Sequence, residues 1–371
     1  MTTTRRDFLQ TTGGALAGLA FVGCELMAAA PARAQGRRRE VVVSGKRAKT
    51  VDVHAHCAVP EALALMNLKL GGPLYRPDLD MATAVAARLR AMDEQGIDVE
   101  ALSINPNWYE TDRDLARRVI QIQNEKLAEA CAANPERFVA FATVALQYPD
   151  LAAEQLEEGV KKYGLRGAGI GGSVNGAEIS DPKFHPFWAK AEQLGVVVFI
   201  HPQGTGAPTD LQHRLKGSGY LENVIGNPLE TTVATSHLIF DGVLERHPKL
   251  KVVLPHAGGY LTHYWARMDH AWKARPDCHT VIKQKPSSYL EKFYFDTITF
   301  DHGMLAPLIA RFGAEHVLLG TDYPYDMGME RPIEFIEGVK GLSKAQAAAI
   351  EGGNAARLLK IDYNAAQRRR S

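Results

Sequence analysis

Short apolar runs alternate with longer amphipathic stretches over most of the chain. Most of the short runs are rich in β-branched or aromatic residues, which is typical of parallel strands buried on both faces. They cover residues 50–54, 99–104, 138–144, 167–170, 196–200, 251–254, 293–296 and 317–320. Between them, apolar positions repeat with a period closer to 3.6 than to 2. This period predicts helices over 81–95, 111–134, 150–163, 186–194, 228–246, 260–273, 303–312 and 344–359.

Eight strands that alternate with helices predict an α/β fold, a (β/α)₈ TIM barrel, over residues 49–362. Two long inserts, 57–79 and 202–227, follow the first and the fifth strand. Both lie at the end of the barrel where active sites are built, so they are candidate lids or substrate walls. A doubly wound open sheet is the alternative, and it would gather its ligands at one switch point between strands.

Composition narrows the possible functions. The chain has 371 residues, of which 46% are hydrophobic and 23% are charged, which is enough to bury a large core. The formal net charge is +1 and no basic stripe is present, so we expect no nucleic-acid partner. The four cysteines include no C-x-x-C pair, which excludes a zinc-finger pattern and suggests no disulfide framework.

The N-terminal segment 1–34 has the pattern of a twin-arginine export signal. Residues 4–10 carry the paired arginines, an apolar run follows over 13–30, and residues 32–34 form a small-residue cleavage site. We therefore expect a periplasmic or exported protein with a linker over 35–48 and a basic tail over 363–371. The apolar run is too short for a confident span, so no stable membrane insertion is expected after cleavage. Lipid anchoring at Cys24 is an open alternative.

Four of the predicted strands end in side chains that bind metals. His54 and His56 are two residues apart, so a strand presents both on the same face. His201, His256 and Asp322 follow the fifth, sixth and eighth runs. The carboxyl ends of barrel strands meet at one mouth, where residues far apart in sequence converge. Imidazoles and a carboxylate suit zinc or a similar divalent ion, so the sequence predicts a metal-dependent enzyme.

Several stretches resemble the decarboxylases of the amidohydrolase-2 branch of the amidohydrolase superfamily. The resemblance extends from about residue 50 to 360. It is carried by Asp52-Val53-His54-Ala55-His56, the segment 90–96, His201-Pro202, the segments 227–232 and 248–252, His256-Ala257-Gly258-Gly259, and Gly320-Thr321-Asp322-Tyr323-Pro324. It implies a single zinc ion held by His54, His56, His201 and Asp322. It also implies that His256 is the acid/base residue, and that Asp322 is a catalytic residue as well as a metal ligand. Manganese would suit the same ligands.

The fourth run, Gly167-Ala168-Gly169-Ile170-Gly171, has no lysine. Binuclear members of the superfamily use a carboxylated lysine there to bridge two ions, so we expect one ion. By the same resemblance, Arg76 binds the substrate carboxylate and Arg267 reaches in from a neighbouring subunit, which implies a homodimer. Arginine suits this role because its planar fork grips a carboxylate with two hydrogen bonds.

One residue departs from the family pattern. Gln203 follows His201-Pro202, where the family has tryptophan, and this replaces an aromatic wall of the substrate site by an amide. The expected function is non-oxidative decarboxylation of a small carboxylate, either aromatic or muconic. Two alternatives stay open at this point. One is an enzyme that uses the same site to hydrolyse a lactone or amide, or to catalyse a hydration. The other is a non-catalytic protein that binds a metal or ligand, and His256 argues against it because binding alone would not need this residue.

Overall fold

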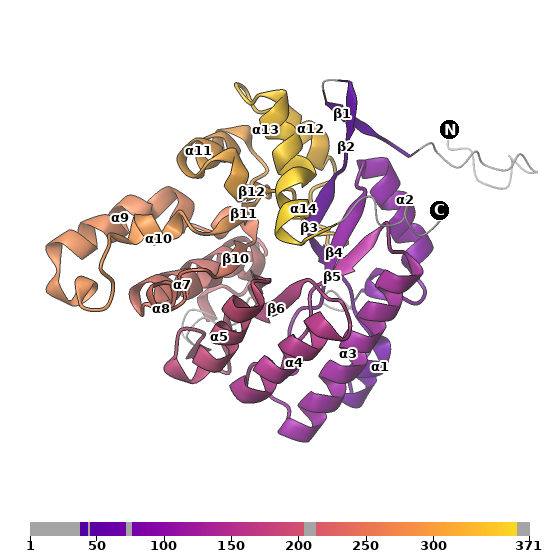
Figure 1. Cartoon of the computed structure of the whole chain (residues 1–371), viewed down its shortest axis with the longest axis horizontal. Helices are drawn as coiled ribbons and strands as arrows, with labels where there is room; N and C mark the ends of the chain where they lie inside the picture. Colours follow the sequence, from indigo (N-terminus) through magenta and orange to yellow (C-terminus); the bar gives the residue numbers. More distant parts are fainter. Residues whose placement is uncertain (1–37, 44, 72–75, 204–212, 362–371) are drawn as a thin grey trace, which may run out of the picture. The chain divides into compact units, whose positions relative to one another are not determined.

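Eight parallel strands form the centre of the structure (Figure 1). This computed structural model describes residues 38–43, 45–71, 76–203 and 213–361, within the unit Arg38–Ser371. The central strands are β3 Val51–His56, β4 Val99–Ser103, β5 Phe138–Ala140, β6 Gly167–Gly171, β9 Val197–His201, β10 Lys251–Leu254, β11 Tyr294–Asp296 and β12 Val317–Leu318. Each overlaps one of the runs from which a strand was predicted.

Backbone hydrogen bonds close these strands into a ring. β3, β4 and β5 form one sheet, and β6, β9, β10, β11 and β12 form another. At the first seam, Ala142 donates to the Gly167 carbonyl at 2.8 Å and accepts from the amide of Gly169 at 3.0 Å. At the second seam, the amide of Val53 donates to the Leu319 carbonyl at 3.0 Å. The predicted (β/α)₈ barrel is confirmed, and the open-sheet alternative is wrong.

Alternate strand residues fill the barrel and face the helices, which explains the near-continuous apolar runs. In β9, Val197 and Phe199 belong to the core inside the ring, whereas Val198 and Ile200 pack in the layer between strands and helices. The side chains of α14 Asn354–Leu358 close the inner core at one end, where Ala355 and Leu358 are buried with the strand residues. Both faces of each strand therefore need hydrophobic side chains.

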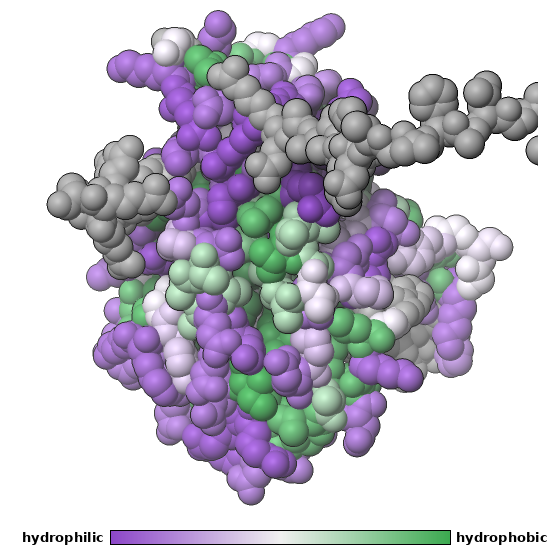
Figure 2. All heavy atoms as spheres, turned by 90° about the vertical axis from the view of Figure 1, so that its right-hand side faces the viewer, coloured by the Kyte–Doolittle hydropathy of each residue, from purple (hydrophilic) through white to green (hydrophobic). Residues whose placement is uncertain are grey.

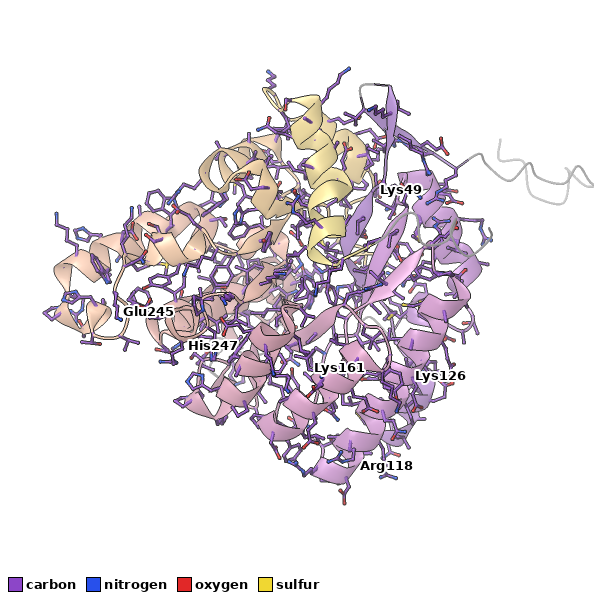
Figure 3. The ribbon with its side chains drawn as sticks, in the orientation of Figure 1. Lys49, Arg118, Lys126, Lys161, Glu245 and His247 are labelled. Carbon is purple, nitrogen blue, oxygen red and sulfur yellow. The ribbon has the colours of Figure 1, made fainter. Side chains whose placement is uncertain are left out.

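Helices surround the ring in the order that the sequence predicts (Figure 1). They are α1 Pro60–Leu65, α2 Val85–Gln95, α3 Arg113–Ala133, α4 Pro149–Lys161, α5 His185–Leu194, α7 Asn227–Phe240, α8 Val243–Arg246, α9 Leu261–Ala274, α10 Pro286–Leu290, α11 His302–Phe312, α12 Pro332–Glu337, α13 Lys344–Ala348 and α14. Figure 3 shows Arg118 and Lys126 of α3 on the outside of the molecule, and Lys126 pairs with Glu129 at 2.8 Å. On the side seen in Figure 2, hydrophilic residues surround a group of hydrophobic residues near the centre.

Two predicted helices are interrupted. The stretch 228–246 breaks between α7 and α8 at Gly242, whose φ of 75° is left-handed and ends a helix. The stretch 344–359 contains a π-helical turn, Ala349–Gly353, between α13 and α14. In this turn the Ile350 carbonyl accepts a hydrogen bond from the amide of Leu319 at 3.0 Å. Contact with the barrel thus replaces the regular helical pattern.

Part of the segment expected as a linker is folded. Residues Val41–Val43 (β1) and Lys46–Ala48 (β2) form an antiparallel hairpin. Arg38 and Arg47 both pair with the buried carboxylate of Asp98, Arg47 at 2.7 Å, and these charges join the hairpin to the barrel. The predicted export signal 1–34 and basic tail 363–371 lie outside the described residues. Among the helices that are described, none is long and apolar enough to cross a membrane.

Glu351 in the π-helical turn makes the stability of the barrel depend on pH. Its side chain is buried, and neither oxygen has a hydrogen-bond partner among the described residues. Burial, followed by repulsion from Glu337, raises the pKa of Glu351 from 4.5 to about 7. The folded state thus holds the proton more tightly, and the free energy of unfolding falls as the pH rises from about 4.5 to 7.

Glu351→Gln removes this pH-dependent loss of stability, because glutamine does not ionise. At pH 8 we expect the variant to be more stable than the wild type by about 1–3 kcal/mol. At pH 5.5 the difference should be smaller. Urea unfolding at both pH values measures it, with the exposed Glu61→Gln as the matched control. An equal difference at the two pH values would contradict the assignment.

Candidate metal centre

Three strand ends bring four metal-binding side chains to one point. His54 and His56 come from β3, His201 is the last residue of β9, and Asp322 follows β12. All four are buried, and their ligand atoms lie within 4.8 Å of one another. Asp322 has a φ of 62°, in the left-handed region that non-glycine residues seldom adopt. Such strain is common where a backbone must aim a functional group.

The distances between these atoms fit a bound cation. The Nε2 atoms of His54 and His56 are 3.0 Å apart, and Asp322 Oδ1 lies 3.3 Å and 2.9 Å from them. Neither ring nitrogen of His201 has a hydrogen-bond partner among the described residues. Ligand atoms around a tetrahedral ion with bonds of about 2.0–2.1 Å are about 3.3 Å apart. The geometry is that of a His/Asp metal-binding site, which was the predicted kind of site.

Asp296, at the end of β11, orients the first ligand. Its Oδ2 atom lies 2.7 Å from His54 Nδ1 and accepts the hydrogen of that nitrogen, so that Nε2 points to the place where the other ligand atoms converge. The same carboxylate accepts the backbone amides of His256 at 3.0 Å and of Ala257 at 2.8 Å. Asp296 lies two strands from His54 in the ring, and this relation became evident only from the fold.

Charges in the cluster favour a bound cation. Burial alone would lower the pKa of His54, but the carboxylates of Asp322 and Asp296 raise it to about 10. Burial would raise the pKa of Asp322, but His54, His256 and His56 hold it well below its usual range. The pKa of His201 is well below 6.5, chiefly because of burial and then because of the neighbouring imidazoles. The carboxylates thus concentrate negative charge where the imidazole nitrogens converge.

His256 lies beside the four ligands without belonging to the cluster. Its Nε2 atom is 3.8 Å from Asp322 Oδ2, and its ring centre is 5.6 Å from that of His201. It also lines a cavity of about 420 Å³ that opens from the centre, as does Asp322. This is the position that a proton-transfer group needs, next to both the ion and the space for a substrate.

A buried polar layer under the ligands was missed by sequence reasoning. Asp52 accepts the backbone amides of His54 at 2.9 Å and of Thr321 at 3.1 Å, and so joins β3 to the segment after β12 that carries Asp322. Arg88 donates to the His56 carbonyl and to Glu100 Oε2, the latter at 2.8 Å. Burial and then the charge of Glu100 raise the pKa of Asp52 to about 7. Arg88 falls inside the predicted helix 81–95, where most charged side chains face solvent. Nothing in the sequence therefore indicated that Arg88 is buried.

The three predicted substrate ligands do not line this cavity. The guanidinium of Arg76 pairs with Asp78 at 2.8 Å. The side chain of Gln203 donates to the Pro106 carbonyl at 2.7 Å, so it joins two loops at the barrel mouth. Arg267 is exposed on α9. Within one chain, therefore, none of the three contacts the space beside His256, and their binding roles stay predictions.

Fold and site together define a metal-dependent barrel enzyme. The chain belongs to the amidohydrolase family, whose model matches residues 51–361. It is 33% identical over 320 residues to 2-amino-3-carboxymuconate-6-semialdehyde decarboxylase from Dictyostelium discoideum, with 85% of each chain covered. The predicted resemblance is confirmed. So is the predicted class of enzyme, a carbon–carbon lyase of this superfamily.

Solved structures give the same result. The 5-carboxyvanillate decarboxylase from Sphingomonas paucimobilis is 27% identical with a TM-score of 0.75, covering 85% of this chain and 99% of that one. A dihydroxybenzoic acid decarboxylase from Polaromonas sp. JS666 is 27% identical with a TM-score of 0.73, covering 85% and 97%. That structure contains manganese and the inhibitor 2-nitroresorcinol.

Asp296→Asn tests the support of His54. The amide cannot accept both the imidazole hydrogen and the backbone amides as a carboxylate does, so the His54 ring loses its fixed orientation. We expect metal affinity to fall about 10- to 100-fold while the fold is retained. Titration against a chelating indicator measures the affinity, and Asp301→Asn in the same loop is the control. Unchanged affinity would show that Asp296 does not orient the ligand.

Proposed function

We propose that this protein is a divalent-metal-dependent, non-oxidative decarboxylase of a small aromatic or muconic-type carboxylate. The observation that carries this proposal is the position of His256, which lies at the cavity and beside the ligand cluster without being part of it. The named relatives, which are decarboxylases of carboxylated aromatic or muconic compounds, support it. A pure binding protein would not need an additional imidazole at that place.

His54, His56, His201 and Asp322 hold the ion in this proposal. Three imidazoles and one carboxylate suit zinc, and manganese is the alternative because it accepts the same donors. When bound, the ion supplies a concentrated positive charge that orients the oxygen atoms of the substrate and stabilises the negative charge that develops. Asp296 and Asp52 keep the ligands in place through the contacts described above.

His256 supplies the proton that the reaction requires. When the carbon–carbon bond breaks, the carboxylate leaves as CO₂ and its bonding electrons remain on the substrate carbon, which must then receive a proton. His256 reaches the cavity from a strained backbone with a φ of 51°, fixed by the bond from its amide to Asp296. Asp322 Oδ2 lies 3.8 Å from its Nε2 atom, so the ring reaches both the ligand cluster and the cavity.

His256→Ala should abolish most of the activity without loss of the ion. We expect the rate of CO₂ release to fall about 10²- to 10⁴-fold, because general acid–base catalysis contributes that much. Carbon dioxide and product are followed by mass spectrometry over a panel of carboxylic acids, and the metal content by elemental analysis.

The exposed His263→Ala at the rim of the same cavity is the control. Formation of two fragments without CO₂ would support the hydrolase alternative. Retention of full activity in His256→Ala would exclude the proposed role of this residue.

We also propose that the active form is a homodimer in which Arg267 of one copy serves the site of the other. α9 buries only Leu261 and Thr262 of its residues, and with α10 it extends away from the ring (Figure 1). Arg267 is exposed on α9, and no hydrogen bond or ion pair joins it to the other described residues. Arg76, on the first insert, would have to exchange Asp78 for the substrate carboxylate.

Mixing two inactive variants tests this arrangement. In a 1:1 mixture of His256→Ala and Arg267→Ala, half of the dimers are mixed, and each mixed dimer has one site with both residues. Activity should therefore recover to about a quarter of the wild-type value after exchange of subunits. Sedimentation measures the dimer. Two variants that remain inactive when mixed, although they exchange subunits, would show that Arg267 acts within its own chain or not at all.

A further inference from the structure

One wall of the cavity beside His256 is apolar, and several of its side chains are exposed. The cavity extends from the metal centre along the π-helical turn Glu222–Gly226, α9 and α11. Five large hydrophobic side chains that line it are 38–64% exposed: Val224, Tyr260, Tyr264, Phe300 and Met304. Half of the exposed large hydrophobic side chains of the described residues thus gather here. Such a patch usually marks a binding surface.

Phe300 is the most unusual of these side chains. It is 55% exposed, in the loop between β11 and α11, and its φ is 59°. The left-handed region is sterically unfavourable for a bulky residue, and the packing of the barrel gains nothing from an exposed ring. His256, Ala257 and Asp322, which also have positive φ, line the same cavity. Strained backbone of this kind persists where function requires it.

The loop that carries Phe300 is fixed to the support of the metal centre. Asp296 Oδ1 accepts the backbone amide of Ile298 at 3.1 Å, while its Oδ2 atom bonds His54. On the other side of Phe300, the Asp301 carboxylate accepts the amide of Gly303 at 2.7 Å and begins α11. The backbone on both sides of Phe300 is therefore anchored, on one side to the carboxylate that also bonds His54, as expected for a residue that contacts a substrate held at the ion.

We propose that Phe300, with Tyr260 and Met304, forms a specificity wall that binds an apolar substituent of an aromatic monocarboxylic acid. The described lining residues include no arginine or lysine, so a second carboxylate at this wall would lack a cationic partner from the same chain. The volume of about 420 Å³ falls in the range of about 300–1,000 Å³ that holds ligands larger than a single ring. An alkyl group or a second ring fits this chemistry. The inference rests on the proposed decarboxylase function and specifies its substrate class.

Substituted 2-hydroxybenzoates test the wall with the metal-loaded full chain. The measured quantity is the ratio of kcat/KM for the 4- or 5-phenyl derivative to that for 2-hydroxybenzoate itself. We expect the wild type to prefer one of the phenyl derivatives, and Phe300→Ala to lower this ratio about tenfold or more. The value for unsubstituted 2-hydroxybenzoate should change less than about twofold. Phe300→Leu should retain part of the preference, and Val281→Ala, an exposed apolar residue outside the cavity lining, should retain all of it.

Binding measurements separate this inference from the proposed function. Phenols in which a nitro group replaces the carboxylate cannot release CO₂, so calorimetry with them reports recognition alone. Suppose that no acid is decarboxylated, but that the phenyl-bearing nitrophenol binds about tenfold more weakly to Phe300→Ala than to the wild type. This result would support the wall and contradict the proposed decarboxylase function. An unchanged ratio in Phe300→Ala, or an equal loss for both ligands, overturns the wall. Conversion of Phe300→Ala to a monomer overturns it as well, because a second copy of the chain would then be the occupant.

Discussion

The seam between the first and the last strand of the ring determines where the metal ligands lie. Next to β12, the amide of Asp322 donates to the His54 carbonyl at 2.8 Å, and the amide of His56 donates to the Tyr323 carbonyl at 2.7 Å. Asp52 also stabilises the seam, because its carboxylate accepts hydrogen bonds from the amide and the hydroxyl group of Thr321. Ring closure therefore brings a carboxylate and two imidazoles together although most of the chain separates them. An open sheet would leave these strands at opposite edges.

Asp296 connects the three functional parts of the molecule. One carboxylate orients the His54 ring, holds the backbone that presents His256 and begins the loop that presents Phe300. The Asp296 side chain is fully buried, and all these partners lie within hydrogen-bond distance of it. A shift of the carboxylate would therefore also shift the groups that are bonded to it. With the roles proposed for His256 and Phe300, metal binding, proton transfer and substrate selection would all depend on a side chain that does not itself belong to the ligand cluster.

The barrel and the convergence of four side chains followed from the sequence because both depend on local patterns. Short apolar runs mark buried strands, and a polar residue directly after each run must lie at the same mouth. The hairpin over 41–48 escaped prediction because it is held by ion pairs of Arg38 and Arg47 with Asp98, which have no periodic signal. The π-helical turn arises from the contact of Ile350 with Leu319. Such long-range contacts cannot be read from the amphipathic pattern.

The roles of residues that bind the substrate or reach a second subunit were the hardest to infer from the sequence. The positions of Arg76 and Arg267 matched a family pattern, yet in one chain both lie away from the cavity. The amide of Gln203 is engaged by the Pro106 carbonyl, which a comparison of residue types could not reveal. The export signal, the choice of zinc and the homodimer stay predictions, since each concerns something other than the folded barrel of a single chain.

In the proposed function, His54, His56, His201 and Asp322 bind one divalent ion. Anomalous X-ray diffraction from crystals of the metal-loaded protein, recorded on both sides of the metal absorption edge, locates that ion. We expect a single peak per chain within about 2.0–2.3 Å of one atom from each of the four side chains. A peak elsewhere, two peaks at this mouth, or a peak that His256 binds in place of one of the four would contradict it.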